Sequence, residues 1–244
     1  MADRQSLKRI APFVIAVMVG YTALHFHPQP LFTYSLRRGE VVLHARSPLP
    51  SRADEILADV EKRLTRSPLY RSDRTYDVFL CDTPALYAFF NPHHRNTGGE
   101  TYVWLGNNIF LRPAHVEADR LIGPSGNDVP GDRTLAYFIA HEVTHAMTVD
   151  AVGVWRYLAL EQWQQDGYAD YVAKAGSFDA AGALRGLRDG SRELDPARSG
   201  LYLRYQLLVA SLLDEGGVTV SELLAGPRAA GPIEARLLAD PAPH

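Results

Sequence analysis

Residues 134–149 read TLAYFIAHEVTHAMTV, and this stretch decides both the fold and the chemistry expected of the chain. Apolar side chains surround its histidines, which predicts a largely buried helix. His141 and His145 are four residues apart, so their imidazoles lie on one face of that helix and can share one zinc ion. Glu142 stands beside the first imidazole, where it can deprotonate a water molecule. Burying these side chains without a partner would be costly, and a metal ion supplies the partner.

A catalytic zinc site needs a third protein ligand and one open position. Cys81 is the only cysteine in the sequence, so the third ligand is expected to be a histidine or a carboxylate. The next stretch that combines helical spacing with acids covers residues 160–174, LEQWQQDGYADYVAK. It offers three candidate ligands, Glu161, Asp166 and Asp170.

The two stretches together resemble the zincin metallopeptidases, and within them the gluzincin-like group. In that family a second helix carries a motif like W-x-x-E-G-x-A-x-Y, whose Glu is the third zinc ligand. Residues 163–171 of this chain read WQQDGYADY. The resemblance, which extends over roughly residues 134–224, implies zinc ligation by His141, His145 and Asp166. Aspartate replaces the family's glutamate and is one methylene shorter, so the two helices must approach more closely or the metal must shift.

The resemblance also implies residues that support the metal site. In thermolysin-like relatives an acid one turn beyond the third ligand orients the first histidine, which points to Asp170 as the hydrogen-bond partner of His141. Relatives stabilise the developing oxyanion with a Tyr or His from a later helix. Here the stretch over 199–217 offers Tyr205 as the first choice and Tyr202 as the second. Gly167 is expected to let the two ligand helices pack closely near the metal.

The rest of the sequence predicts an α+β fold of the zincin type, a small mixed sheet followed by the active-site and ligand helices. We expect an N-terminal α/β part over 31–133, a helical zinc-binding part over 134–230 and a tail over 231–244. The expected strands are a hairpin within 31–45 that turns at 37–39, then 75–81, 101–105 and 109–111; the expected helices follow Ser51 and cover 84–89, 134–148, 155–174, 201–215 and a short piece from 220.

Residues 10–26, IAPFVIAVMVGYTALHF, form the longest apolar run. As a helix they would be about 26 Å long, against a hydrocarbon core of about 30 Å. Basic residues within 1–9 favour a cytoplasmic N-terminus. We therefore expect a transmembrane signal anchor over 10–26 in contact with the lipid bilayer, and a periplasmic or extracellular catalytic domain. A cleaved signal peptide and a buried core helix are the alternatives.

Composition excludes some functions. The sequence has 25 basic and 28 acidic residues and a net charge of −3, which argues against nucleic-acid binding. Cys81 ends a β-rich run and is expected to be a small buried hydrophobe. His93 and His94 lie in a polar loop and are expected at the surface rather than at the metal.

The sequence thus predicts a membrane-anchored zinc metallopeptidase that hydrolyses protein or peptide substrates with Glu142 as general base. A catalytically degenerate zincin, which would use the metal to stabilise a binding or scaffold protein, is the main alternative, and the Asp166 substitution is the hint toward it. A hydrolase that uses the same metal on a bond other than a peptide is a third reading.

Overall fold

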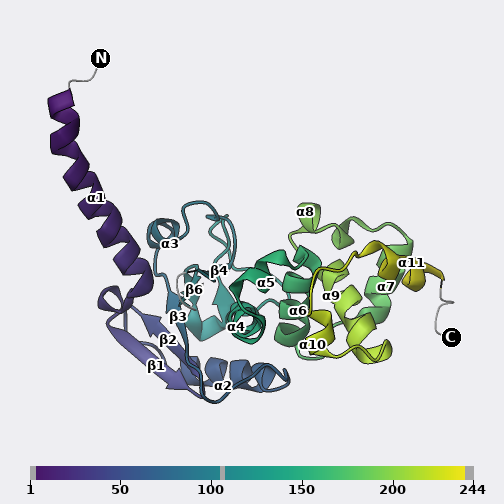
Figure 1. The fold of residues 1–244 in the computed structure, drawn as a ribbon. Coiled ribbons are helices and arrows are strands. Elements are labelled where there is room, and N and C mark those ends of the chain that lie inside the picture. The colour runs from purple at the N-terminus through teal and green to yellow at the C-terminus, as the bar shows by residue number, and fades with distance from the viewer. Residues whose placement is uncertain (1–3, 105–107, 240–244) are drawn as a thin grey trace.

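The computed structural model describes residues 4–104 and 108–239. A five-stranded sheet is built by the first half of the chain, and a group of helices by the second half. Helix α4 (Leu135–Val152) lies between the two, packed against sheet strands on one side and against α6 (Gln162–Lys174) on the other (Figure 1). The helix that carries the HExxH sequence is therefore the centre of the molecule.

The sheet is mixed. Its strands are β1 (Tyr34–Arg38), β2 (Val41–Ala45), β3 (Tyr76–Leu80), β4 (Gly99–Thr101) and β5 (Asn108–Leu111), in the order β1-β2-β3-β5-β4. The three central strands run parallel, and β1 and β4 pair antiparallel at the two edges. Helix α2 (Arg52–Leu64) connects β2 with β3, and α3 (Pro84–Phe90) follows β3. β6 (Ala114–His115) and β7 (Arg120–Leu121) form a separate short ladder.

The central strands are buried on both faces because successive side chains of a strand point in opposite directions. Leu43, Val78 and Ile109 are paired across three neighbouring strands and belong to the main core, together with α2 and α4. Phe79 and Phe110 are also paired, but they belong to a second, smaller core beneath α3. A helix placed on the first face, as α4 is, therefore has an apolar support along its length.

Helix α4 has clear ends. Its N-cap residue Thr134 accepts a hydrogen bond from the backbone N–H of Tyr137, and the helix stops at Gly153, whose φ of 82° suits glycine. Every residue from Leu135 to Val149 is buried. The remaining helices are α5 (Val154–Ala159), α7 (Ala180–Arg188), α8 (Pro196–Ser199), α9 (Leu203–Ala210), α10 (Val220–Leu223) and α11 (Gly231–Ala239).

The expected transmembrane helix over 10–26 is wrong. None of the helices in the described ranges is both long enough and apolar enough to cross a membrane, so the single-pass localisation derived from it is corrected as well. The last turns of α1 (Arg4–Phe26) instead belong to the folded body. His25 is 3% exposed and contacts the carbonyl of Phe90, while the Tyr21 hydroxyl donates to the carbonyl of Phe89.

Other expectations also differ from the structure. The strand expected over 101–105 is β4, which ends at Thr101, and residue 105 lies outside the described ranges. The single helix expected over 155–174 is broken into α5 and α6, because Leu160 and Glu161 are extended. Residues 231–239, expected to begin the tail, form α11, whose Leu237 carbonyl accepts a hydrogen bond from Arg188. Of the predicted end segments, residues 1–3 and 240–244 lie outside the described ranges.

Candidate metal centre

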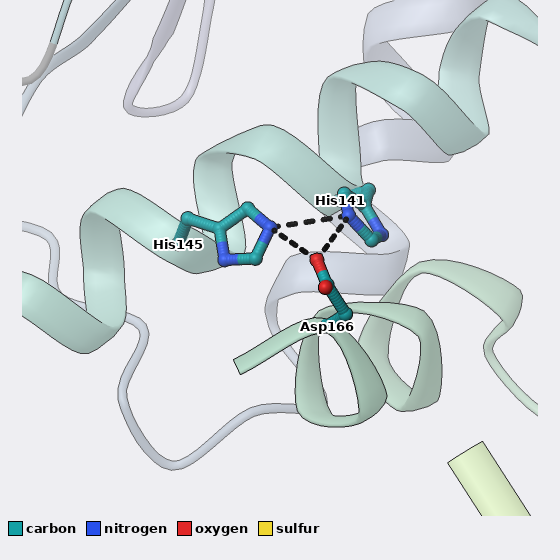
Figure 2. A group of neighbouring side chains, drawn as sticks. All are labelled: His141, His145 and Asp166. Carbon is teal, nitrogen blue, oxygen red and sulfur yellow. Dashed lines mark hydrogen bonds and ion pairs between the residues drawn. The ribbon is translucent and has the colours of Figure 1, made fainter. Parts of the chain in front are cut away.

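Two helices bring three metal-binding side chains to one point. His141 and His145 project from the same face of α4, and Asp166 projects toward them from α6 (Figure 2). The Nε2 atoms of the two imidazoles are 3.1 Å apart. Asp166 Oδ1 lies 3.8 Å from Nε2 of His141 and 3.6 Å from Nε2 of His145. The three residues predicted as ligands thus form a group that can hold a metal ion.

The spacing of these three atoms fits a small divalent ion. The point equidistant from them is about 2.0 Å from each atom, which is the distance at which zinc binds imidazole nitrogen and carboxylate oxygen. His141 and His145 are buried, and Asp166 is nearly so. Because all three side chains come from helices that pack directly against each other, the shorter aspartate still reaches the imidazoles.

Asp170 supports the first histidine from behind. Its Oδ1 atom lies 2.9 Å from Nδ1 of His141 and accepts a hydrogen bond from the hydroxyl of Tyr137. Lys174, one turn further along α6, places its Nζ atom 3.7 Å from Oδ2 of Asp170. A carboxylate at Nδ1 accepts a hydrogen bond from that nitrogen, so in the neutral imidazole Nε2 is the atom that can bind a metal ion.

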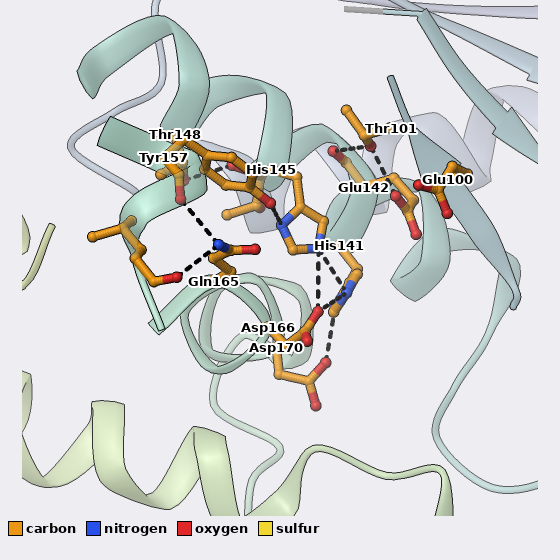
Figure 3. A network of polar contacts seen from close by, with 12 residues as sticks. Glu100, Thr101, His141, Glu142, His145, Thr148, Tyr157, Gln165, Asp166 and Asp170 are labelled. Carbon is orange, nitrogen blue, oxygen red and sulfur yellow. Dashed lines mark hydrogen bonds and ion pairs between the residues drawn. The ribbon is translucent and has the colours of Figure 1, made fainter. Parts of the chain in front are cut away.

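Tyr157 supports the second histidine. Its hydroxyl oxygen lies 2.9 Å from Nδ1 of His145, and the tyrosine comes from the short helix α5 that joins the two ligand helices (Figure 3). The side-chain amide of Gln165 donates to the carbonyls of Tyr157 and Leu160, at 2.9 and 3.0 Å. These bonds fix the bend between α5 and α6 and so fix where the phenol lies.

Glu142 is buried beside the group, and its carboxylate meets β4. The hydroxyl of Thr101 lies 2.8 Å from its Oε2 atom and 3.0 Å from its backbone oxygen. Burial is the main cause that raises the pKa of Glu142, to about 7, although the charge of His141 and the bond to Thr101 act in the opposite direction. A Cβ atom on Gly99 would lie 2.6 Å from Cδ2 of Leu111 and 2.8 Å from Oε1 of Glu142, so a larger residue at this position would displace one of these side chains.

The electrostatics of the histidines differ because their neighbours differ. Burial lowers the pKa of His141, but its contacts with Asp166 and Asp170 outweigh burial and raise that pKa to about 10. Burial and the charge of His141 lower the pKa of His145 to about 4. The two carboxylates therefore attract positive charge to the point that the imidazoles share.

A cleft of about 510 Å³ opens onto the group. Residues from α4, α5, α6, β4 and the segment before α9 line it, among them Thr101, Tyr137, His141, Glu142, His145, Tyr157, Asp166 and Tyr202. The ring of Tyr202 is nearly parallel to that of His141, with centroids 5.8 Å apart. Tyr205, the first choice from the sequence, is not among the lining residues and stacks instead behind Tyr202.

The other sequence candidates lie away from the metal-binding group. Glu161 is exposed and stands at the N-cap of α6, where its backbone N–H donates to the side-chain oxygen of Gln164 at 3.1 Å. His93 and His94 are exposed, as expected, and His94 contacts Glu100 at 2.8 Å. Cys81 is buried in the second core.

Sequence reasoning missed three residues that contact the site. Tyr137 lies one turn before His141 on the same face of α4, and that spacing could have indicated it. Tyr157 becomes visible only once the break between α5 and α6 is known. Thr101 meets Glu142 across 41 positions in sequence, and no local pattern indicates such a contact.

Comparison with models of known protein families gives no match to this chain, and comparison with curated protein sequences gives none either.

Proposed function

We propose that this protein is a zinc-dependent peptidase of the zincin type, which hydrolyses peptide bonds with Glu142 as general base. One observation carries the proposal: a His-His-Asp ligand group and a buried glutamate, adjacent in sequence to the first ligand, line the same cleft. A purely structural metal site needs neither a cleft nor a base. The resemblance of residues 134–171 to zincin motifs supports the same assignment.

Zinc is the metal that this donor set suits best. Two imidazole nitrogens and one carboxylate oxygen form the ligand type of catalytic zinc sites that keep a fourth position open. Magnesium and calcium prefer oxygen ligands throughout. When bound, a zinc ion supplies a Lewis acid that acidifies water and polarises a carbonyl group.

The residues of the chain divide the remaining work. Glu142 accepts the proton of the attacking water and then donates it to the amine that leaves. The hydroxyl of Thr101 donates to that carboxylate and holds it against β4. Asp170 and Tyr157 orient the two imidazoles. Tyr202 replaces Tyr205 as the proposed donor to the developing oxyanion, because Tyr202 lines the cleft.

Glu142→Gln in the full chain tests the proposal. Wild-type protein and variant are purified, loaded with zinc, and incubated with a peptide library whose products are identified by mass spectrometry. We expect cleavage by the wild type and a loss of about 100-fold or more in the variant, with an unchanged zinc content by elemental analysis. Glu117→Gln, on an exposed glutamate away from the cleft, is the matched control and should behave as wild type.

The outcomes separate the proposal from its alternatives. Wild-type rates in Glu142→Gln would rule out Glu142 as the base. Stoichiometric zinc without cleavage of any peptide by the wild type would favour the degenerate zincin that acts as a binding protein. Absence of stoichiometric zinc would overturn the metal assignment itself.

A further inference from the structure

Arg133 is a charged residue of the cleft that the proposed chemistry does not use. It immediately precedes the N-cap of α4 and lines the same cleft as His141 and Asp166. One of its guanidinium nitrogens donates to the carbonyl of Gly200 at 3.3 Å. A guanidinium group has five N–H donors, so one hydrogen bond to a neutral carbonyl leaves most of its capacity free.

The carboxylates of the cleft are engaged elsewhere. Glu100 contacts His94, Glu142 contacts Thr101, and Asp166 belongs to the metal-binding group. Within residues 4–104 and 108–239, no carboxylate forms an ion pair with Arg133. Arginine in a cleft is best satisfied by a planar carboxylate, which accepts two parallel N–H bonds from its fork. Such a partner can come from a bound molecule.

The position of Arg133 limits how far its partner group can lie from the metal-binding group. Arg133, Tyr137, His141 and His145 recur at intervals of four residues and all line the cleft. Helix α4 rises about 9 Å from Leu135 to His141, and the two residues before it add at most about 7 Å of extended backbone, so Arg133 lies at most about 16 Å from His141 along the chain. An extended peptide covers that distance in about five residues or fewer.

We propose that Arg133 binds a carboxylate group of the substrate, located within about five residues of the bond that is cleaved. The inference rests on the proposed peptidase function and names its substrate class: a peptide with either a free C-terminal carboxylate or an acidic side chain at that distance. Arg133 acts on binding of the substrate, whereas Glu142 acts on the reaction itself.

The experiment uses the best-cleaved library peptide in matched forms. One pair differs only in a C-terminal carboxylate or amide, and a second series carries Asp or Asn at successive positions from the cleaved bond. Wild-type protein should lose about tenfold or more in kcat/KM when the carboxylate is replaced, mainly through KM. Arg133→Gln should cleave both members of a pair equally, and Arg133→Lys should keep part of the preference. An effect in the carboxylate and amide pair indicates a C-terminal carboxylate, and an effect in the Asp and Asn series indicates a side-chain carboxylate.

A binding measurement makes the result independent of turnover. Fluorescence anisotropy of the labelled peptides on zinc-loaded Glu142→Gln, with and without Arg133→Gln, should show the same carboxylate preference lost with Arg133. Arg185→Gln is the matched control, since Arg185 is exposed on α7 and pairs with Asp179. Melting curves for each variant confirm that the fold is intact.

The failures are distinguishable. If the wild type cleaves and binds carboxylate and amide peptides equally, or Arg133→Gln keeps the preference, the role of Arg133 is wrong while the peptidase proposal stands. If no peptide is cleaved but the carboxylate form binds through Arg133, the peptidase proposal fails and the carboxylate site stands.

Discussion

The hydroxyl oxygen of Tyr157 lies 2.9 Å from Nδ1 of His145, so the short helix between the two ligand helices contributes to the metal-binding group as well as connecting them. His141 has an equivalent partner in Asp170, also at 2.9 Å. Each imidazole is therefore held from behind, one by a carboxylate and the other by a neutral phenol. Removing the phenol that holds His145 gives the first prediction.

Tyr157→Phe should weaken zinc binding by about 10- to 100-fold, because loss of a partner behind a metal-binding histidine frees the ring and lowers its basicity. Competition with a chromophoric chelator measures the affinity. Tyr168→Phe is the control: it removes another buried tyrosine hydroxyl of this helical region, one that bonds Ser67 and not a histidine. Equal zinc affinity of wild type and Tyr157→Phe would show that the phenol does not position His145.

Removal of the metal should lower thermal stability. Free zinc at 100 times its dissociation constant stabilises the folded chain by about 2.7 kcal/mol, which corresponds to roughly 5–11 °C in Tm for a chain of this size. Asp166→Ala should lose most of this zinc-dependent shift, because only the two imidazoles remain. Calorimetry with zinc and with a chelator tests it. A full zinc-dependent shift in Asp166→Ala would contradict ligation by Asp166, and Asp82→Ala serves as an exposed control.

Gly167→Ala should destabilise the chain by about 1–3 kcal/mol through overpacking. A Cβ atom there would lie 2.6 Å from the backbone oxygen of Tyr205, so α6 and α9 could not keep their distance. Denaturant titration gives the change in the free energy of unfolding. Gly231→Ala, where an added Cβ meets nothing within 4 Å, should be close to neutral. Equal stability of Gly167→Ala and wild type would show that the close contact between α6 and α9 does not require glycine.

Cys81 should resist alkylation in the folded chain at pH values where free thiols react. Burial is the main cause that raises the pKa of its thiol, so the folded chain keeps the proton as pH rises past the ordinary cysteine value of about 8.5. The unfolded chain loses its proton there, so this group makes the folded state less stable above that pH, and not below it. Mass spectrometry after iodoacetamide treatment at pH 9, with and without denaturant, tests it. Rapid labelling of the native chain would contradict the prediction.

Local spacing predicted most of the metal-binding group. An i, i+4 pair on a helix fixes two imidazoles whatever the rest of the fold does, so His141 and His145 followed from the sequence alone. Asp166 followed from resemblance, and the packing of α6 on α4 places it at the imidazoles. Thr101 could not be predicted, because its contact depends on how an edge strand meets α4.

The errors have a common cause, which is packing between distant segments. Residues 10–26 read as a membrane span because hydropathy is a local average, whereas the contacts of Tyr21 and His25 with α3 depend on residues more than sixty positions away. The choice between Tyr205 and Tyr202 as oxyanion donor stays a prediction, and what bears on it is the packing of the segment before α9, which places Tyr202 in the lining of the cleft. The expected helix over 155–174 hid the bend that places Tyr157.

The three ligands, the two groups that hold the imidazoles (Asp170 and Tyr157) and the tyrosine that bonds Asp170 all fall between Tyr137 and Asp170. Closing so short a loop costs little chain entropy. The contacts that build the metal-binding group are therefore of low contact order and can form early in folding. The position of the general base depends on a more distant contact, because Glu142 is held by Thr101 from the edge of the sheet. A chain whose helices have formed before its edge strand pairs would thus capture the ion first and gain its anchored carboxylate afterwards.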